Sequence, residues 1–322
     1  MEKREIIMHT IISGIESISQ NTENVLRKVS TYQFKTIETK QQLIEALHSC
    51  DIFWFRLNHK LTKEILENSK CKFIVCAVTG LDHIDLESCK ENNITVISLK
   101  GEFEFLKEVR ATAEHTIGLL LTLIRKTKNA YSHVENGNWD RTQFQGTELY
   151  KKKVGIIGLG RLGKIVAEYY NVMGMHVFYY DINKQEKYEN KYTAVNSIEA
   201  LFKEIDVLSI HLPYNTSTHF ILNEKNLNTL KKNALVVNTS RGGVIDEQAL
   251  LNLLNTDKIA GYATDVLYGE PDIINHPLVK YAKKNNNVVI TPHIGGNTFE
   301  SIEKTELFVI QKLKKIVEQC QK

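Results

Sequence analysis

A glycine-rich stretch at residues 154–163 constrains the fold of this chain more than any other feature of the sequence. The apolar run 154–157 has the composition of a buried strand, and residues 164–168 begin a helical pattern. Between them, Gly158, Gly160 and Gly163 follow the spacing G-x-G-x-x-G. The first glycine permits a tight turn, the second lets a pyrophosphate approach the backbone, and the third lets the helix pack against the strand. Because the helix also presents free N–H groups to an anion, this unit predicts dinucleotide binding.

An acidic residue follows at the distance that a bound dinucleotide requires. The next apolar run, residues 175–180, ends at Asp181, about 20 residues beyond the glycines, where a ribose hydroxyl needs a hydrogen-bond acceptor. A 2′-phosphate about 4 Å from this carboxylate would cost roughly 4 kcal/mol per unit charge at an effective dielectric constant of about 20. We therefore predict that the chain uses NAD rather than NADP.

Composition and charge argue against several other classes of protein. The formal net charge of +3 is small and spread along the chain, so it indicates neither a nucleic-acid surface nor a membrane surface. The longest apolar stretch, residues 117–124, is too short to span a bilayer, and residues 1–5 lack the apolar region of a signal peptide. The five cysteines show no metal-ligand spacing. We expect a cytoplasmic protein with a small-molecule substrate, no metal site, and no nucleic-acid or membrane partner.

Apolar runs alternate with helical patterns through most of the sequence. In the first hundred residues the runs are 6–8, 52–55, 73–76 and 94–97, and after the glycine-rich stretch they are 175–180, 206–211, 234–238, 261–266 and 288–291. Strands that alternate with helices in this way predict parallel sheets covered by helices on both faces. The fold class is therefore α/β, with two doubly wound parallel sheets in two domains. Asp246 is placed to cap a helix at residues 247–255.

Two helical segments lie outside this alternation. Residues 103–136 predict one long helix, whose middle is apolar on nearly all sides, as in a helix buried between domains or subunits. Glu114 and His115 in this segment are candidates either for catalysis or for an ion or hydrogen-bond pair at a helix end. Residues 299–322 predict an amphipathic helix that crosses back to the first domain.

Polar residues follow four strands of the second half, at the end where doubly wound sheets bind ligands. These exits are His211 to Pro213, Thr239 to Gly243, Asp265 to Pro271 and Thr291 to Gly296. Arg241 can hold a substrate carboxylate with its bidentate fork and polarise an adjacent carbonyl. His293 can pass a proton to the substrate oxygen as hydride reaches carbon, and Glu270 can orient the imidazole and favour its protonated form. We therefore predict that Arg241, Glu270 and His293 are catalytic.

The same motifs resemble those of the D-isomer-specific 2-hydroxyacid dehydrogenases, in a short form without a regulatory domain. The resemblance covers most of the chain from about residue 50 and is carried by residues 154–163, 211–213, 236–243, 265–271 and 291–296. It implies a flavodoxin-like substrate domain (residues 1–101 and 297–322), a Rossmann NAD-binding domain (residues 102–296), a cleft between them where catalysis occurs, and a homodimer. It assigns cofactor contacts to Thr112, Gly158, Gly160, Arg161, Leu162, Gly163, Asp181, His211, Pro213, Thr239, Ser240, Asp265 and Gly295.

The predicted substrate loop departs from the family pattern. Val78, Thr79 and Gly80 resemble the loop whose backbone N–H groups hold the substrate carboxylate, but Val78 stands where many members have glycine, and His83 where many have asparagine. Valine disfavours a positive φ, so the path of this loop depends on that substitution. Arg56, after an earlier strand, resembles an arginine of the phosphoglycerate-oxidising branch. Substrate binding is thus predicted for Arg56, Val78, Thr79, Gly80 and Arg241.

These observations lead to one main hypothesis and two alternatives. The main hypothesis is an NAD-dependent enzyme that interconverts a 2-keto acid and a D-2-hydroxy acid. One alternative is a non-enzymatic NAD-sensing scaffold, like the corepressor relatives that share this fold and can retain the catalytic residues. The other is oxidation of phosphite or formate, since both anions suit an arginine-lined site and Val78 alters the loop.

Overall fold

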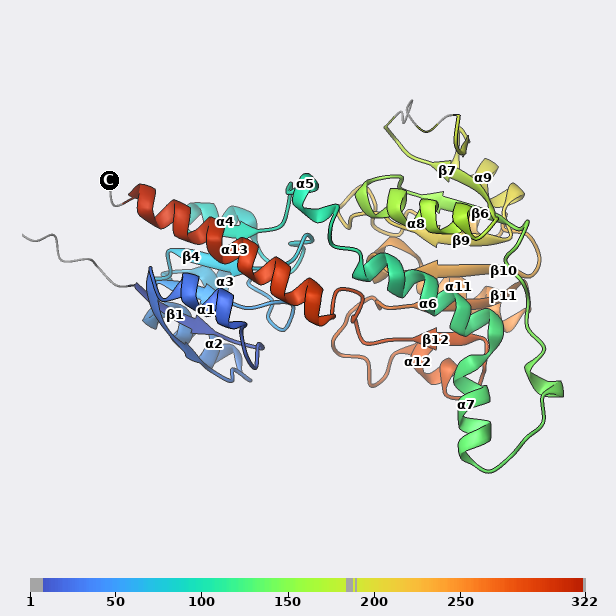
Figure 1. Ribbon diagram of the computed structural model, residues 1–322, viewed down its shortest axis with the longest axis horizontal. Coiled ribbons are helices and arrows are strands. Elements are labelled where there is room, and N and C mark those ends of the chain that lie inside the picture. Colours follow the sequence, from blue (N-terminus) through green and yellow to red (C-terminus); the bar gives the residue numbers. More distant parts are fainter. Residues whose placement is uncertain (1–7, 184–187, 189, 321–322) are drawn as a thin grey trace, which may run out of the picture. The chain divides into compact units, whose positions relative to one another are not determined.

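The computed structural model describes residues 8–183, 188 and 190–320 of the chain. The chain divides into two compact units, one formed by residues 1–109 and 298–322 and the other by residues 110–297 (Figure 1). The first unit is therefore built from the two ends of the sequence, and the second is one continuous segment. Each unit has its own parallel sheet.

The sheet of the first unit has the strand order β2-β1-β3-β4-β5 within the described residues. Its strands are β1 (Met8–Ile12), β2 (Ser30–Phe34), β3 (Ile52–Trp54), β4 (Phe73–Cys76) and β5 (Thr95–Ser98). Of the predicted run 6–8, Ile6 and Ile7 lie outside the described residues. The polar strand β2 was not predicted, because the sequence Ser-Thr-Tyr-Gln-Phe lacks a buried apolar face.

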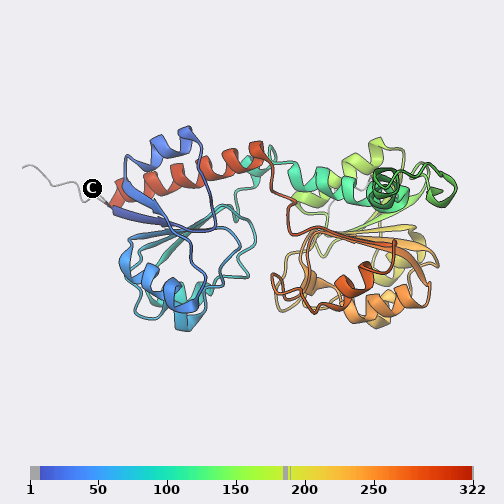
Figure 2. The same ribbon diagram turned by 90° about the horizontal axis from the view of Figure 1, so that it is seen from below.

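Helices cover both faces of this sheet (Figure 2). On one face lie α2 (Lys40–Ser49), α3 (Lys63–Leu66) and α4 (Leu86–Glu91), and on the other α1 (Gln20–Leu26), α5 (Phe103–Leu106) and α13 (Phe299–Cys320). The strands alternate between the two cores: Phe53 faces the first group of helices, while Ile52 and Trp54 face the second. The C-terminal helix α13 thus packs on the N-terminal part of the chain, where Val309 and Leu313 are fully buried.

The sheet of the second unit has the order β12-β11-β10-β9-β6-β7-β8 within the described residues. Its strands are β6 (Lys153–Ile157), β7 (His176–Tyr180), β8 (Thr193–Ala194), β9 (Val207–Ile210), β10 (Ala234–Asn238), β11 (Ile259–Thr264) and β12 (Val288–Ile290). The fold class predicted from the sequence, α/β with two parallel sheets, is confirmed. The edge strand β8 was not predicted, because it is only two residues long.

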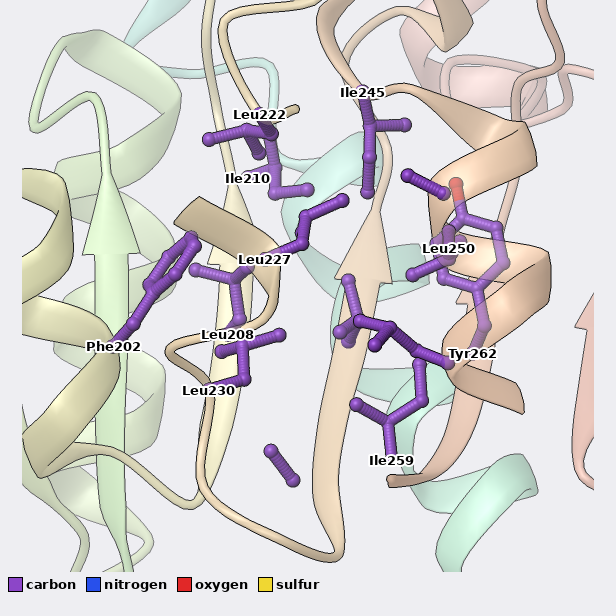
Figure 3. Packing of buried hydrophobic residues seen from close by; sticks show 14 of the residues in the cluster. Phe202, Leu208, Ile210, Leu222, Leu227, Leu230, Ile245, Leu250, Ile259 and Tyr262 are labelled. Atoms are coloured by element: carbon purple, nitrogen blue, oxygen red, sulfur yellow. The ribbon is translucent and has the colours of Figure 1, made fainter. Parts of the chain in front are cut away.

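Two layers of helices enclose this second sheet. The helices α9 (Ile198–Glu204), α10 (Glu224–Leu227), α11 (Glu247–Asn255) and α12 (Pro277–Ala282) cover one face, where Figure 3 shows Phe202, Leu250 and Tyr262 in the shared core. The helices α6 (Ala111–Arg125) and α8 (Arg161–Val172) cover the other face. The predicted cap of α11 is confirmed, since the Asp246 side chain accepts hydrogen bonds from the backbone N–H groups of Gln248 and Ala249.

The single long helix predicted for residues 103–136 is wrong. The segment forms three helices: α5, α6 and α7 (Thr127–Glu135). Lys126 adopts the left-handed conformation, with φ of +52°, and this ends α6 and begins α7 in a new direction. Only part of the apolar surface of α6 is buried, because Leu121 is exposed. Among the described helices, none combines the length and the apolar character needed to cross a membrane.

Candidate active site

The strands of the second sheet are parallel, so the segments that follow them gather at one edge. The strand order reverses between β6 and β9, which are hydrogen-bonded neighbours. The glycine-rich loop follows β6, and the segment from His211 to Pro213 follows β9. Ligands of doubly wound sheets bind at such a reversal point, outside the carboxyl ends of the strands. The sheet therefore brings the two predicted cofactor segments to the place where a dinucleotide is expected.

The glycine-rich loop has the backbone that a pyrophosphate needs. Gly158 has φ of +87°, and a Cβ atom there would lie 2.5 Å from the carbonyl oxygen of His211. A Cβ atom on Gly163 would lie 2.1 Å from the carbonyl oxygen of Gly158, so only glycine lets α8 come this close. Gly160 faces open space, and no side chain caps the first turn of α8. The N–H groups of that turn, starting at Arg161, are therefore directed at the position of an anion. These residues fit a dinucleotide.

Among the other predicted cofactor contacts, Asp181, Arg161 and Leu162 are half-buried, and Pro213 is exposed. Asp181 directly follows β7 and is half-buried, and its Oδ1 accepts the N–H of Asn183 at 2.8 Å. Burial lowers the pKa of Arg161, and Leu162 packs against the core under α8. Pro213 uses its carbonyl oxygen to bind the Thr218 hydroxyl at 2.7 Å.

His211 lies two residues before Pro213, in the same segment after β9. Its Nε2 is 2.8 Å from the hydroxyl of Ser209. Its Nδ1 is buried and has no hydrogen-bond partner among the described residues. Burial lowers the pKa of His211 to about 3, so the imidazole is neutral at physiological pH.

The first turns of α6 contact three strand exits of the same edge. The hydroxyl of Thr116 lies 2.7 Å from that of Thr239, after β10. A Cβ atom on Gly295 would lie 3.1 Å from the Thr112 side chain. His115 lies in the same turns, with its Nε2 2.9 Å from the Thr291 hydroxyl and 3.3 Å from a carboxylate oxygen of Asp265. These contacts support the prediction of His115 as a hydrogen-bonded residue near a helix end rather than a catalytic one.

Asp265 is buried and organises the segment after β12. Its Oδ1 accepts hydrogen bonds from the Thr291 hydroxyl at 2.6 Å and the N–H of Ile294 at 2.8 Å, and its Oδ2 accepts the N–H of Gly295 at 2.7 Å. Burial alone would raise the pKa of Asp265, but the hydrogen bonds from His115, Thr291 and the two backbone N–H groups outweigh it and lower that pKa. The carboxylate is therefore ionised and holds the turn on both sides of His293.

His293 and Glu270 form a direct pair. The Nδ1 atom of His293 lies 2.5 Å from Oε1 of Glu270, while Oε2 of Glu270 accepts the N–H of Leu267 at 3.0 Å. His293 has φ of +56°, and its N–H donates to the carbonyl oxygens of Asp265 and Thr291. The peptide bond from Glu270 to Pro271 is cis. The carboxylate fixes one ring nitrogen of the histidine, which leaves Nε2 for a substrate.

The turn that carries Arg241 approaches the loop that carries Glu270 through the backbone of Gly242. Its guanidinium donates to the carbonyl oxygen of Ser240 at 2.8 Å, and the Asn238 side chain binds both the Ser240 hydroxyl and the Arg241 carbonyl oxygen. A Cβ atom on Gly242 would lie 2.1 Å from the nitrogen of Tyr268, in the loop that carries Glu270. The turn of Arg241 and the loop of Glu270 are therefore in backbone contact at the same edge of the sheet.

Apart from Arg241, the predicted substrate residues belong to the first unit. Arg56 follows β3 and forms an ion pair with Glu306 of α13, whose side chain is 1% exposed. Burial raises the pKa of Glu306, against the opposing effect of the Arg56 charge. Val78 follows β4, donates its N–H to the carbonyl oxygen of Cys76 and does not adopt a positive φ, so valine suits this loop. Thr79 is exposed and Gly80 is half-buried.

Three residues of these networks were not predicted. Glu306 holds Arg56, and Glu247 and His276 form a buried pair against the Glu270 loop. Each partner lies far away in the sequence, so no local pattern indicates the pairs. The only local sign was the position of Glu247 at the start of a helix, where an acidic residue is common for other reasons.

Fold and site together define a dinucleotide-binding α/β protein with an imidazole–carboxylate pair and an arginine turn on the binding edge of its sheet. The family model of the D-isomer specific 2-hydroxyacid dehydrogenase, NAD binding domain, matches residues 117–295. The chain belongs to this family.

The chain is similar to relatives with several different names. It is 33% identical over 305 residues to the D-3-phosphoglycerate dehydrogenase of Methanocaldococcus jannaschii, covering 94% of this chain and 56% of that one. It is 33% identical over 277 residues to the hydroxypyruvate reductase of Thermotoga maritima, covering 85% and 87%. The structure of D-lactate dehydrogenase from Aquifex aeolicus, complexed with NAD and lactic acid, superimposes with a TM-score of 0.79 at 28% identity and 96% coverage of each chain. The chain spans about half the length of the phosphoglycerate dehydrogenases of Methanocaldococcus jannaschii and Synechocystis.

Proposed function

We propose that the protein is an NAD-dependent oxidoreductase that interconverts a 2-keto acid and a D-2-hydroxy acid. The observation that carries this proposal is the pair of His293 and Glu270, joined at 2.5 Å on the sheet edge where the glycine-rich loop also lies. The names of the relatives are those of dehydrogenases and reductases, which favours the enzyme over the non-enzymatic scaffold. The family model also describes an NAD-binding domain.

Each site residue has a separate task in this reaction. When bound, the nicotinamide supplies the hydride for ketone reduction or accepts it in the reverse direction. His293 donates the proton to the carbonyl oxygen from Nε2, because its Nδ1 is held by Glu270. Glu270 holds Nδ1 of His293 and thereby orients the imidazole. Arg241 binds the substrate carboxylate and stabilises negative charge on the carbonyl oxygen.

We assign the cofactor to the second unit and the substrate loop to the first. Gly158, Gly160 and the first turn of α8 would hold the pyrophosphate, and Asp181 would bind the ribose hydroxyls. The remaining predicted contacts lie on the exits of β9 to β12 and on α6. In the first unit, Arg56 and the loop of Val78, Thr79 and Gly80 follow adjacent strands of the sheet, β3 and β4, which supports a shared role in substrate binding. The two units of the fold correspond to a substrate domain and an NAD-binding domain.

We further propose a cytoplasmic homodimer. The cysteines Cys50, Cys71, Cys76 and Cys89 are buried and unpaired and Cys320 is free, as expected in a reducing compartment. The helix α7 has no buried residue, and Tyr131, Val134 and Trp139 in and beyond it are 69%, 51% and 91% exposed. Neighbouring apolar side chains with this much exposure favour a protein interface. A second copy of the chain is the partner that the family resemblance implies.

A substrate panel tests the proposed activity. The purified protein is incubated with NADH and each of a series of 2-keto acids, and the loss of NADH absorbance is followed. We expect turnover with at least one 2-keto acid and a product of D configuration, identified by chiral chromatography. Phosphite and formate, tested with NAD, represent the alternative chemistry. Turnover of those two anions without turnover of any 2-keto acid would contradict the proposal, as would the absence of all turnover in protein that binds NADH.

A further inference from the structure

A second acid–imidazole pair contacts the loop that carries Glu270. Glu247 is the first residue of α11, and its Oε2 lies 2.9 Å from Nε2 of His276, just before α12. Each of these two side chains is only 10% exposed. The remaining ring nitrogen of His276 is buried and has no hydrogen-bond partner in the part of the chain that the structure describes. A polar pair with this little exposure is costly to desolvate unless it is hydrogen-bonded.

Glu247 also binds the loop that carries Glu270. Its Oε1 accepts the backbone N–H of Tyr268 at 3.2 Å. The preceding N–H, that of Leu267, donates to Glu270 itself at 3.0 Å. Two consecutive N–H groups are thus held by two carboxyl groups, just before Gly269 with φ of +88°. Glu247 therefore ties down the segment from which the Glu270 side chain extends.

The same segment lies directly on the turn of Arg241. A Cβ atom on Gly242 would be 2.1 Å from the nitrogen of Tyr268 and 2.2 Å from the carbonyl carbon of Leu267. The backbone of this turn leads through Gly242–Val244 into α11, where Glu247 begins the helix. Glu247 thus contacts both the Glu270 loop, at Tyr268, and His276 before α12, and it follows the Arg241 turn in the chain. A shift of the loop would move the Glu270 carboxylate away from the Nδ1 atom of His293.

We propose that Glu247, supported by His276, is a positioning residue that fixes the loop of Glu270 and thereby keeps His293 oriented for proton transfer. This inference rests on the proposed function, since it concerns the same proton-transfer pair. It assigns no contact with substrate or cofactor to Glu247.

The charges around Glu247 agree with this role. Burial raises the pKa of Glu247 to about 8, against the Tyr268 hydrogen bond, and the charges of Glu270 and Asp246 raise it further. Burial likewise lowers the pKa of His276. Tyr262 on β11 is fully buried. Its pKa is raised, first by burial and then by the charge of Glu247. At neutral pH the pair of Glu247 and His276 is therefore uncharged.

Substitutions at Glu247 test the proposal by separating turnover from binding. Glu247→Gln keeps an oxygen for the Tyr268 N–H and an N–H for His276, in a side chain that is neutral like the native acid at pH 7. Glu247→Ala removes both hydrogen bonds. We expect Glu247→Ala to lower kcat by roughly 10- to 100-fold, because small misplacements of catalytic groups have effects of that size. The dissociation constant for NADH and the melting temperature should stay close to those of the wild type.

The glutamine variant and two further variants complete the test. Glu247→Gln should retain kcat within about threefold of the wild type, and His276→Ala should lower kcat several-fold without weakening NADH binding. Gln248→Ala, at the exposed next position of α11, is the matched control. Unchanged kcat in folded Glu247→Ala would overturn the proposal, as would equal losses in the alanine and glutamine variants. If Glu247→Ala does not fold, an unchanged kcat in His276→Ala overturns it. A wild type without any dehydrogenase activity would instead refute the proposed function, and this inference with it.

Discussion

His293 adopts a backbone conformation that is uncommon for a residue with a side chain. Its φ of +56° lies in the left-handed region, where only a few per cent of non-glycine residues are found. Hydrogen bonds to Asp265 stabilise this backbone conformation. The carbonyl oxygen of Asp265 accepts the N–H of His293, and its carboxylate accepts the N–H groups of Ile294 and Gly295. Such conformations persist where the surroundings determine them, and they occur often at functional sites. The backbone strain at His293 thus agrees with its proposed role.

Asp181 gives a prediction about cofactor choice. Because a 2′-phosphate would lie near its carboxylate, Asp181→Ala should raise the kcat/KM ratio of NADPH to NADH by about 10- to 1000-fold, the larger value following from roughly 4 kcal/mol of repulsion. The ratio is measured with both reduced cofactors at one saturating 2-keto acid. Glu168→Ala, on α8, serves as the control for loss of a negative charge. An unchanged ratio in Asp181→Ala would contradict the assignment of Asp181 to the ribose hydroxyls.

His211 gives a prediction about stability at acid pH. Burial holds its folded pKa at about 3, below the ordinary value of 6.5. Between these two values the unfolded chain binds a proton that the folded chain does not, so stability falls as the pH falls below about 6.5. From pH 7 to pH 5, the wild type should lose about 1 to 2 kcal/mol more unfolding free energy than His211→Gln. Urea unfolding at both pH values measures this difference, and equal losses in the two proteins would show that the imidazole does not become more acidic on folding.

At the scale of elements, α13 contributes the C-terminal end of the chain to the core of the first unit. Leu313→Ala removes a fully buried side chain and should cost about 2 to 5 kcal/mol. Trp54 is fully buried in the same core and Trp139 is 91% exposed, so tryptophan fluorescence during urea unfolding reports mainly on this unit. Lys315→Ala, exposed on the same helix, should leave the midpoint unchanged. NADH binding should persist in Leu313→Ala below its transition, and a wild-type midpoint would contradict the packing described.

The sequence patterns predict the buried elements well and the exposed ones poorly. The core strands β6, β9 and β10 were predicted within a residue or two, because apolar runs of this kind are typical of parallel strands buried on both faces. The strand β2 lies at a sheet edge and has polar side chains, so it lacks that signal. The break between α6 and α7 depends on the left-handed conformation of Lys126. Lysine does not favour this conformation, so the sequence gives no sign of the break.

The candidate site was predictable to the extent that it follows strand ends. Glu270 and His293 belong to segments after β11 and β12, and parallel strands bring such segments to one edge; their contact follows from that rule. The pairs of Glu247 with His276 and of Arg56 with Glu306 each join a helical residue to a residue of a distant loop, and such packing depends on tertiary structure. These contacts could be found only in the structure.

At the scale of the whole molecule, the exposed apolar side chains of α7 predict an association. We expect a dimer in solution, with twice the 36.9 kDa of one chain, measured by light scattering during size-exclusion chromatography. Tyr131→Ser combined with Trp139→Ser should shift the protein toward monomer by exposing less apolar surface. Val172→Ser changes an 80% exposed apolar residue elsewhere and is the control. A wild-type monomer, or a double variant with unchanged dimer affinity, would contradict the proposed interface.

The most direct test of the account is the turnover of His293→Ala in steady-state and binding experiments. The imidazole is held by Glu270 at 2.5 Å and is assigned the proton transfer, a contribution of about 10²- to 10⁴-fold in rate. We predict that kcat for the best 2-keto acid falls by that factor, while NADH binds as tightly as in the wild type. His48→Ala, an exposed histidine of α2, should behave like the wild type. Wild-type turnover by His293→Ala would contradict the central claim that this histidine moves the proton.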